Sequence, residues 1–377
     1  MLDLENNRIM EEIESLSSRK RWQDIRDMLL LFEPADTAAI LAELQSDRLP
    51  LIYRLLPKEL AAEVFVEMEP EEQEQLIQTF SDTELKEVLD ELYVDDTVDL
   101  IEEMPASVVK RILRHADPET RRRVNEILKY PEDSAGSIMT TEFVDLKRDM
   151  SVADALKRIR HTGIDKETIN ICYVTDPSRR LLGLVSIRTL LLADQEDIIE
   201  EIMETNVVSA TTMDDKEDVA QDLSKYDFLA MPVVDKEHRL VGIVTIDDAI
   251  DVMEEEATED FELMAAITPT DKPYLRAGVW ETVKSRLPWL MLLMLSATFT
   301  GVVISSFEDS LAACSVLIGF IPMLMGTGGN CGNQSSVAVI RGLSLNEIGF
   351  GDLLSVVWKE SRVALLCGVL LAAWNFA

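Results

Sequence analysis

The sequence predicts a multidomain protein with an all-α superhelical N-terminal domain, an α/β region that contains two copies of one module, and an incomplete α-helical transmembrane domain. Three observations predict this class. Apolar residues recur with helical spacing over residues 1–130, β and α runs repeat over 137–250, and long uncharged stretches begin at Leu287. The 377 residues, 47% of them hydrophobic, are enough for several cores and exclude a largely disordered chain.

Charge and composition narrow the function classes. The chain carries 70 Asp and Glu against 36 Lys and Arg, a formal charge of −34, which disfavours nucleic acid as a partner and favours cations. The four cysteines and three histidines are scattered and match no disulfide, zinc or catalytic spacing. Because the sequence also shows no nucleophile–base set and no phosphate-binding loop, we expect a non-enzyme.

Residues 1–130 predict an acidic domain of short stacked helices, each about a dozen residues long, as in a solenoid. Proline recurs where a new helix should begin, at Pro57, Pro70, Pro105 and Pro118. Within this domain, Asp95, Asp96 and Asp99 have two interpretations: a solvated helix face, or a contact with a divalent cation.

An internal repeat follows, with copies predicted at residues 137–200 and 201–250. The segment GLVSIRTLL (Gly183–Leu191) of the first copy corresponds to GIVTIDDAI (Gly242–Ile250) of the second. Each copy has the order helix, apolar strand, turn, strand, helix, which predicts two structurally equivalent α/β modules.

These residues resemble a tandem CBS pair, a regulatory module whose copies often bind adenine nucleotides such as ATP between them. In that family the Ser/Thr and Asp of the repeated segment contact the nucleotide, which implies Thr245 and Asp248 as nucleotide-binding residues here. The first copy has Ser186 followed by Thr189 instead of Asp, a departure that weakens the nucleotide expectation for that copy. The alternative role of Asp248 is to cap its helix.

An acidic connecting helix is predicted at residues 251–272, after the second copy. Its carboxylates recur at i, i+3 and i+4, where like charges repel one another. Divalent cations would neutralise them, because hard cations prefer oxygen ligands and Mg²⁺ keeps much of its water. A solvated connector is the alternative, but the helix leads directly into the predicted membrane region.

Residues 273–377 predict a partial membrane domain with spans at about 287–307, 311–340 and 358–377. The first stretch is uncharged and long enough to cross the hydrocarbon layer. The third apolar run, from Val363, gives only about 22 Å of helix before Ala377, too short to cross alone. We therefore expect the chain to be a fragment of a longer membrane protein.

Charges beside the first span predict its orientation. Lys284 and Arg286 precede it, and positive residues mark the cytoplasmic side. No signal peptide is recognisable after Met1. These features predict a multi-pass protein of the cell (inner) membrane, with the lipid bilayer as a partner and residues 1–286 in the cytoplasm.

The segment FIPMLMGTGGNCGNQSSVAVIRGL (Phe320–Leu343) is rich in glycine and amides. Such glycines allow close helix packing or a break in the helix at membrane depth. The amide oxygens suit the hydration shell of an ion, whereas a plain packing seam leaves the amides without a role. The predicted pore-lining residues are Pro322, Gly326, Gly328, Gly329, Asn330 and Asn333.

With this motif after a tandem CBS pair and an acidic helical domain, the chain resembles the MgtE-type magnesium transporters over essentially its whole length. The resemblance implies a homodimer with five membrane helices per subunit, whose acidic cytoplasmic part binds Mg²⁺ and closes the pore. The ion-selecting aspartate of that family lies in a fifth membrane helix, which this sequence does not reach. The implied Mg²⁺-sensing residues are Asp215, Glu217, Asp227, Asp248, Asp251, Glu256, Glu259 and Asp260, with Asp95, Asp96 and Asp99 aligned more loosely.

The predicted function is Mg²⁺-selective uptake with feedback closure by intracellular Mg²⁺. At low Mg²⁺ the acidic faces repel one another and the pore opens, and at high Mg²⁺ the bridged carboxylates close it. Two alternatives stay open: a CBS-regulated transporter of Mn²⁺ or Co²⁺, and a membrane-anchored nucleotide-sensing adaptor.

Overall fold

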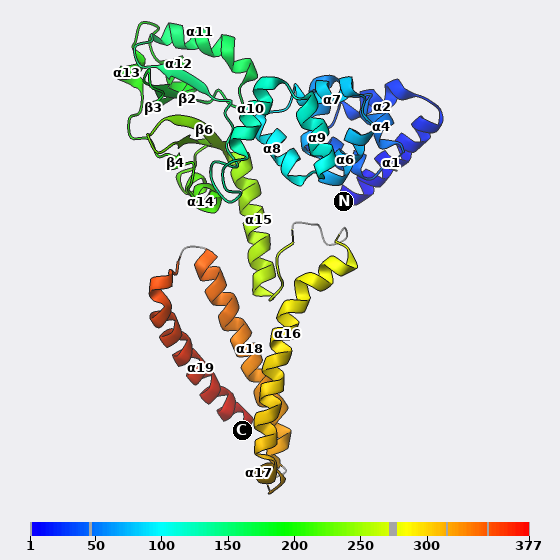
Figure 1. Ribbon diagram of the computed structural model, residues 1–377, viewed down its shortest axis with the longest axis vertical. Helices are drawn as coiled ribbons and strands as arrows, with labels where there is room; N and C mark the ends of the chain where they lie inside the picture. The colour runs from blue at the N-terminus through cyan, green and yellow to red at the C-terminus, as the bar shows by residue number, and fades with distance from the viewer. Residues whose placement is uncertain (1, 45–46, 271–276, 314–315, 345–346, 377) are drawn as a thin grey trace. The chain divides into compact units, whose positions relative to one another are not determined.

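The computed structural model describes residues 2–44, 47–270, 277–313, 316–344 and 347–376 (Figure 1). The chain divides into two compact units, Met1–Val252 and Met253–Ala377. Residues 271–276, where the predicted connecting segment passes into the predicted membrane domain, lie outside the described residues, as do 314–315 and 377 of the predicted spans.

The first unit begins with an array of short helices, which confirms the all-α N-terminal domain. Pro70 and Pro118 occupy the first turns of their helices, and Pro57 and Pro105 directly precede theirs, as the sequence predicts. The helices are α1 (Leu2–Ser18), α2 (Trp22–Leu29), α3 (Pro34–Ala42), α4 (Leu49–Tyr53), α5 (Lys58–Val66), α6 (Pro70–Thr79), α7 (Asp82–Leu89), α8 (Val94–Glu103), α9 (Ala106–His115) and α10 (Pro118–Ile127).

The array packs in rows. Helix α3 packs on α5, α5 on α7 and α7 on α9, so each helix buries one apolar face against the next of its row. Leu76, Leu85 and Ile112 are fully buried in the resulting core. Arg111 of α9 donates to the backbone carbonyls of Ile77 and Phe80, which supplies hydrogen bonds to the otherwise unsatisfied end of α6.

Two equivalent α/β modules follow, which confirms the predicted CBS-like repeat. In each sheet the first strand pairs parallel with the second, and the second pairs antiparallel with the third. The first copy contains β1 (Val144–Lys147), α11 (Val152–Thr162), the 3-10 turn η1 (Gly163–Asp165), β2 (Ile171–Thr175), β3 (Leu181–Ser186) and α12 (Ile187–Leu192). The second contains α13 (Ile199–Ile202), β4 (Ala210–Thr211), α14 (Lys216–Tyr226), β5 (Ala230–Val234), β6 (Leu240–Thr245) and α15 (Ile246–Met264).

The two copies are joined at their hairpins and by the segment that leaves the helical array. The amide of Leu240 donates to the carbonyl of Arg179 at 2.9 Å. Thr140, which precedes β1, exchanges backbone hydrogen bonds of 2.8 and 2.9 Å with Ile243 of β6. This pairing holds the start of the first copy against the last strand of the second, and it determines which side chains meet at the site below.

The second unit is helical: α16 (Val279–Ser306), α17 (Glu308–Ala313), α18 (Val316–Ser344), the short η2 (Phe350–Asp352) and α19 (Leu353–Phe376). Among the described residues, α16 is the one helix whose length and composition would allow it to cross a membrane. The crossings predicted for α18 and α19 stay predictions.

Two features of these helices differ from the alternatives that the sequence left open. Helix α18 runs without a break through its glycines and contains Pro322, so the irregular backbone considered for this segment is absent over the described residues 316–344. Helix α19 begins at Leu353, before the apolar run at Val363, and its 24 residues span about 36 Å. Helix α19 therefore begins before the predicted span, because Lys359, Glu360 and Arg362 belong to the same helix, and its crossing of the membrane stays untested.

Candidate cation site

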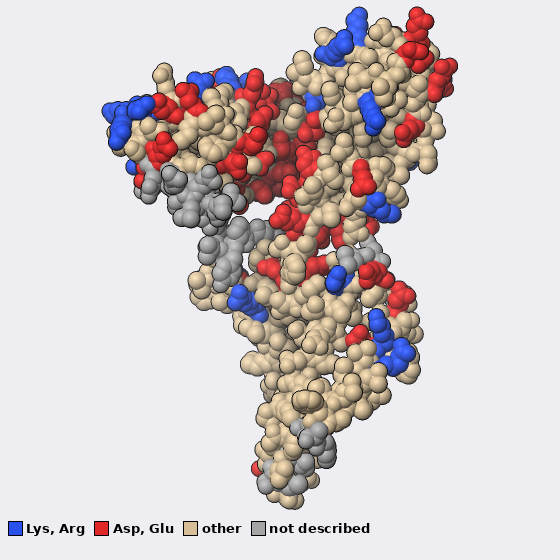
Figure 2. Space-filling view, turned by 180° about the vertical axis from the view of Figure 1, so that it is seen from behind, with Lys and Arg blue, Asp and Glu red and all other residues tan. Residues whose placement is uncertain are grey.

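A carboxylate cluster lies where the helical array meets the CBS pair, inside the first unit. Figure 2 shows the acidic side chains gathered in this region. Its members come from the start of α8, from the segments that precede β1 and β2, and from the start of α15. The cluster consists of Asp95, Asp96, Asp99, Glu142, Glu167, Asp247 and Asp248. The charges of its members contribute to the raised pKa of Asp95, Asp96, Asp99, Glu167 and Asp248.

Asp95 is the most deeply placed member. It lies in the first turn of α8 and is only 6% exposed, and its Oδ1 atom has no hydrogen-bond partner in the described part of the chain. Burial and then the charge of Asp248 raise the pKa of Asp95 well above its ordinary value. A buried acceptor without a partner is costly, so this oxygen is suited to bind a cation or a donor.

The other two aspartates of α8 follow at the next positions of the same helix. Burial is the first cause that raises the pKa of Asp96 to about 6, although Asp96 also accepts a 3.4 Å hydrogen bond from the amide of Tyr93. Partial loss of hydration and then the charge of Asp248 raise the pKa of Asp99 to about 8. Asp99 is exposed, whereas Asp95 is buried. Solvent therefore screens the interactions of Asp99 with nearby charges more than it screens those of Asp95.

The first CBS copy contributes Glu142 and Glu167. The Oε2 atom of Glu142 accepts a 3.1 Å hydrogen bond from the amide of Val94, at the first position of α8, and its Oε1 atom lies 3.3 Å from Arg123 of α10. Burial, followed by the charge of Asp96, raises the pKa of Glu167 to about 8, and its Oε2 atom is buried without a described partner. Glu142 thereby connects the first CBS copy to α8 and α10 of the helical array.

Asp248 represents the second copy. Its pKa is raised to about 7, chiefly by burial, although the hydroxyl of Thr245 donates to its Oδ2 atom and opposes the shift. The corresponding residues of the first copy, Ser186 and Thr189, hold each other through a 2.9 Å hydroxyl contact. The nucleotide motif thus adopts the same local geometry in both copies, but only the second copy carries a carboxylate there.

The chemistry of the cluster favours a hard cation. Carboxylate oxygens are the ligands that Mg²⁺ prefers, and each ionised member raises the cost of ionising the next. Among the described residues, no three His, Cys, Asp or Glu side chains already surround a common point at which a metal ion would sit. We therefore expect Mg²⁺ to bind with retained water, or with a small closing movement of the carboxylates.

Three of the predicted sensing residues lie on or beside α14, two at its start and one at its end. Asp215 caps the start of this helix and accepts a 2.9 Å hydrogen bond from the amide of Glu217, whose own carboxylate accepts 3.0 Å from Gln221. Asp227 ends the helix in the left-handed conformation, at φ 54°. Eleven helical residues, about 16 Å, separate the two ends, so the structure does not bring Asp215 and Asp227 together.

The remaining predicted acids lie on α15 after Asp248. Asp251 belongs to the first unit, and Glu256, Glu259 and Asp260 belong to the second. All four lie on one continuous helix and are exposed or half-buried. Their participation in cation binding stays a prediction.

The predicted pore residues lie on α18. At 100° per residue, Pro322, Gly326, Asn330 and Asn333 share one face, Gly329 lies at its edge and Gly328 lies elsewhere. The hydroxyl of Ser335, on another face, donates to Glu360 of α19 at 2.6 Å. A Cβ atom added at any of these three glycines would contact nothing within 4 Å, so the glycine face is uncovered within the described part of the chain.

Sequence reasoning missed Glu142, Glu167 and Asp247 as members of the site. Glu142 and Glu167 are single acids in loops, with no local spacing that marks them. The signal available was topological: both precede strands of the first copy, and the pairing of Thr140 with Ile243 turns that edge toward the second copy. Asp247 was visible only as one more acid in an acidic helix.

A cavity of about 260 Å³ lies between the two CBS copies, near their hairpins. Lys166 and Arg179 line it, together with Thr141, Thr175 and Asp145. The charge of Asp145 is balanced by its ion pairs with Lys147 and Arg158. The Oγ1 atom of Thr141 is buried without a described partner. Positive and hydroxyl groups in an otherwise acidic protein suit an anionic group such as a phosphate.

Family models match most of the chain. A model for the MgtE intracellular N domain matches residues 32–133, CBS domain models match 135–196 and 199–255, and a divalent cation transporter model matches 321–377. The magnesium transporter MgtE of Thermus thermophilus is 39% identical over 372 residues, which cover 96% of this chain and 82% of that protein. The magnesium transporter MgtE of Bacillus subtilis is 34% identical, over 93% of this chain and 78% of that protein.

Two solved structures of magnesium transporter domains are similar to the first unit. The cytosolic domain of the Mg²⁺ channel MgtE in complex with ATP aligns with a TM-score of 0.60 and 39% identity, over 63% of this chain and 97% of that one. The soluble part of a magnesium transporter aligns with a TM-score of 0.62 and 30% identity, over 67% of this chain and 99% of that one. A helical array and a CBS pair, followed along the chain by a segment that matches a divalent cation transporter, define a membrane transport protein that contains a CBS pair. The chain belongs to the MgtE family of magnesium transporters.

Proposed function

We propose that this protein transports Mg²⁺ into the cell and is closed by intracellular Mg²⁺ that binds the carboxylate cluster. The observation that carries the regulatory part is the burial of Asp95 opposite Asp248, with an oxygen that lacks a partner among the described residues. The names of its relatives support magnesium as the transported ion and disfavour the Mn²⁺ or Co²⁺ alternative.

The cluster supplies a free-energy difference between two arrangements of the cytoplasmic domains. Two like charges 4 Å apart repel by about 1 kcal/mol in bulk water, and by more near protein. Without Mg²⁺ this repulsion favours separation of the helical array from the CBS pair. With Mg²⁺ at about 100 times its Kd, binding favours the compact arrangement by about 2.7 kcal/mol.

The residues that would hold the ion are the buried and half-buried carboxylates of both domains, above all Asp95, Glu167 and Asp248. Mg²⁺ supplies the positive charge that lets these groups stay ionised side by side. The exposed acids of α15 extend the same charge toward the membrane helices. We assign closure of the pore to this helix, as the family resemblance implies.

Transport is assigned to the membrane helices. The face of α18 that carries Asn330 and Asn333 offers amide oxygens to a hydrated ion, and its glycines keep that face free of bulk. A multi-pass arrangement in the cell membrane, a homodimer and cytoplasmic residues 1–286 complete the proposal. The family consists of transporters, so we assign no enzymatic activity.

The proposed domains are an N-terminal acidic domain at 1–130, CBS copies at 137–200 and 201–250, a connecting region at 251–272 and a membrane domain at 273–377. The helical part of the connecting region ends at Met264, so the helix predicted to continue to residue 272 is shorter than expected within the described residues. The matched family models support the division into helical, CBS and transporter parts. A linker at residues 131–136 joins the first two parts.

An adenine nucleotide is the proposed second ligand, because a solved relative carries ATP. Thr245 and Asp248 are the residues that the motif assigns to it. Their carboxylate neighbours would repel phosphates, so a nucleotide at that place needs Mg²⁺ or must direct its phosphates toward Lys166 and Arg179. These basic residues favour the second orientation. The adaptor alternative, in which nucleotide sensing is the sole function, is not favoured by the family.

Mg²⁺ influx into proteoliposomes that contain the intact protein tests the proposal. Internal Mg²⁺ is varied, and influx is followed with a trapped Mg²⁺ indicator. The double variant Asp95→Asn/Asp248→Asn should transport normally at low internal Mg²⁺ but need at least about tenfold more Mg²⁺ for half-inhibition. Asp36→Asn is the matched control, because Asp36 is also an acid in the first turn of a helix but is exposed. An unchanged half-inhibiting concentration in the double variant would contradict the assignment.

A further inference from the structure

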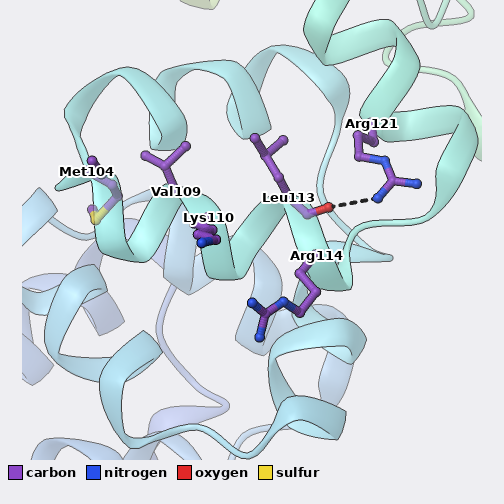
Figure 3. Close-up of a pocket in the computed structure, with 7 residues that line it drawn as sticks. Met104, Val109, Lys110, Leu113, Arg114 and Arg121 are labelled. Atoms are coloured by element: carbon purple, nitrogen blue, oxygen red, sulfur yellow. Dashed lines mark hydrogen bonds between the residues drawn. The ribbon is translucent and has the colours of Figure 1, made fainter.

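Helix α9 carries an open groove on the face that it turns away from the array (Figure 3). The groove has a volume of about 660 Å³. Met104, Val109 and Leu113 supply apolar surface, and Lys110 and Arg114 extend from the same helix. The remaining lining residues are Ala106 and, from α10, Arg121.

The basic residues of this groove are unusual in so acidic a protein. Residues 110–129 contain seven Lys and Arg but three acids, whereas the whole chain has a formal charge of −34. Some of these cations serve the fold: Arg111 lies 3.1 Å from Asp82, and Arg123 lies 2.5 Å from Glu119. Lys110, Arg114 and Arg121, the three that line the groove, have no carboxylate partner among the described residues.

Arg121 shows how the groove is held in shape. Its guanidinium donates to the backbone carbonyl of Leu113 at 3.2 Å, which ties α10 to the end of α9 (Figure 3). This bond leaves the charge of Arg121 without a counter-ion. Arg121 is therefore held at the edge of the groove, and Lys110 and Arg114 add two further cations from α9.

The lining residues of α9 follow helical spacing. Ala106, Val109, Lys110, Leu113 and Arg114 stand at i, i+3, i+4, i+7 and i+8, which is one stripe along the helix. The opposite face of α9 packs on α6 and α7. The small side chain of Ala106 lets another backbone approach closely. The stripe is about two turns long, and its apolar residues Val109 and Leu113 pack partly against the core and remain partly exposed.

We propose that this groove docks an acidic amphipathic helix of a partner protein, with apolar residues at i, i+3, i+4 and i+7 and Asp or Glu on both flanks. Charge complementarity selects the acidic flanks, because three cations without carboxylate partners border the apolar floor. The lining residues of α9 have the spacing of a helix-packing stripe, in which Val109 and Leu113 are half-buried, and this favours a helix as the occupant. Helix α9 is basic, whereas most of the described helices are acidic. An acidic partner helix would therefore resemble those helices in charge.

The test uses the intact protein in nanodiscs of zwitterionic lipid and a fluorescent peptide of about 18 residues, long enough to form a helix. The peptide has Leu at i, i+3, i+4 and i+7 and Glu on the flanks. We expect saturable binding in fluorescence anisotropy that weakens as salt is raised. A peptide of the same composition in scrambled order should bind at least about tenfold more weakly, because it presents no apolar stripe.

Variants assign the binding to the groove. Lys110→Glu/Arg114→Glu should weaken binding of the acidic peptide by at least about tenfold. Lys129→Glu is the matched control, since Lys129 is an exposed cation of the same region outside the groove, and it should leave binding unchanged. Circular dichroism checks folding, and the milder Lys110→Ala should weaken binding in the same direction if the double variant unfolds.

Other occupants give different results. Equal affinity of the double variant, or equal binding of the scrambled peptide, overturns the proposal. Self-association in analytical ultracentrifugation that the double variant abolishes, without peptide binding, assigns the groove to a second copy. Association with nanodiscs only when anionic lipid is present assigns it to the membrane. Each of these outcomes excludes the acidic helix as the occupant.

Discussion

Asp248, at the start of α15, and Asp95, an almost completely buried residue of α8, interact through their charges: burial, and after it the charge of Asp248, raises the pKa of Asp95. The two residues belong to different domains, and their interaction is unfavourable while both are ionised. A cation placed between such groups reverses the sign of the interaction. The pair can therefore respond to the intracellular concentration of a divalent ion.

Replacing Asp95 by Asn should stabilise the metal-free protein at pH 8. The substitution removes a buried charge, for an expected gain of about 1 kcal/mol and a rise in Tm of about 2–4 °C. It should also reduce the stabilisation that Mg²⁺ provides. Thermal unfolding with and without Mg²⁺ measures both effects, and Asp36→Asn should change neither. A lower Tm for Asp95→Asn without Mg²⁺ would contradict the interpretation.

The cluster predicts a pH dependence of stability. Folding raises the pKa of Asp99 and Glu167 to about 8, from ordinary values near 4, so the folded state binds more protons between these limits. Their contribution is fully present below about pH 4 and is lost as the pH rises through about 8. Metal-free stability should therefore fall from pH 5 to pH 8 in urea titrations.

Saturating Mg²⁺ should flatten this dependence, because the bound ion favours the ionised carboxylates. The fall in stability should also become shallower in Glu167→Gln, which removes one of the titrating groups. A pH profile that is the same with and without Mg²⁺ would exclude the cluster as the origin.

Removing a cation that neighbours the carboxylate cluster should tighten Mg²⁺ binding, whereas removing an acid of the cluster should weaken it. Arg123 lies 3.3 Å from Glu142, so Arg123→Ala removes a positive charge that offsets the charge of this carboxylate. We expect Mg²⁺ to bind about fivefold more tightly, from an added interaction of about 1 kcal/mol. Calorimetric titration with Mg²⁺ measures the affinity. Arg122→Ala is the control, since Arg122 pairs with Glu126 and not with a cluster member.

Thr189 predicts a difference between the two copies in nucleotide binding. Its hydroxyl contacts Ser186, and it stands where the second copy has Asp248. Thr189→Asp should tighten ATP binding by about tenfold, because a carboxylate is a stronger acceptor for a ribose hydroxyl. Thr189→Ser, which keeps the hydroxyl, should leave the affinity unchanged. Fluorescent ATP-analogue titration distinguishes these outcomes, and no change in Thr189→Asp would exclude the first-copy motif.

We predict that the amide of Asn333 takes part in transport. Asn333→Leu should reduce Mg²⁺ influx by at least about tenfold, because it replaces an amide on the proposed ion path with an apolar group. Asn333→Gln should retain most of the influx. Detergent-solubilised variants of equal Tm establish that the loss is not one of folding. Normal influx in Asn333→Leu would show that this face does not line the path.

Much of the fold follows from local patterns in the sequence. Proline at helix starts, the repeated GLVSIRTLL and GIVTIDDAI segments and the uncharged run after Leu287 each predict an element that the structure contains. These signals are local, so they survive without tertiary information. The length of α19 was underestimated because Lys359, Glu360 and Arg362 interrupt the apolar pattern without interrupting the helix.

The site was only half visible. Asp95, Asp96, Asp99 and Asp248 lie in acidic runs, and the structure brings them together. Glu142 and Glu167 join them through backbone pairing between distant segments, which no spacing rule can detect. The family resemblance also implied Asp215 and Asp227 as sensing residues, and the structure places them at opposite ends of α14.

The central claim is that Mg²⁺ draws the helical array onto the CBS pair through the carboxylate cluster. Pulsed electron–electron double resonance between spin labels at Ser107 of α9 and Ser224 of α14, both exposed, measures this separation directly. A long, broad distance distribution in metal-free buffer should become short and narrow at millimolar Mg²⁺, and the change should be absent in Asp95→Asn/Asp248→Asn. The same distribution at every Mg²⁺ concentration would contradict the account.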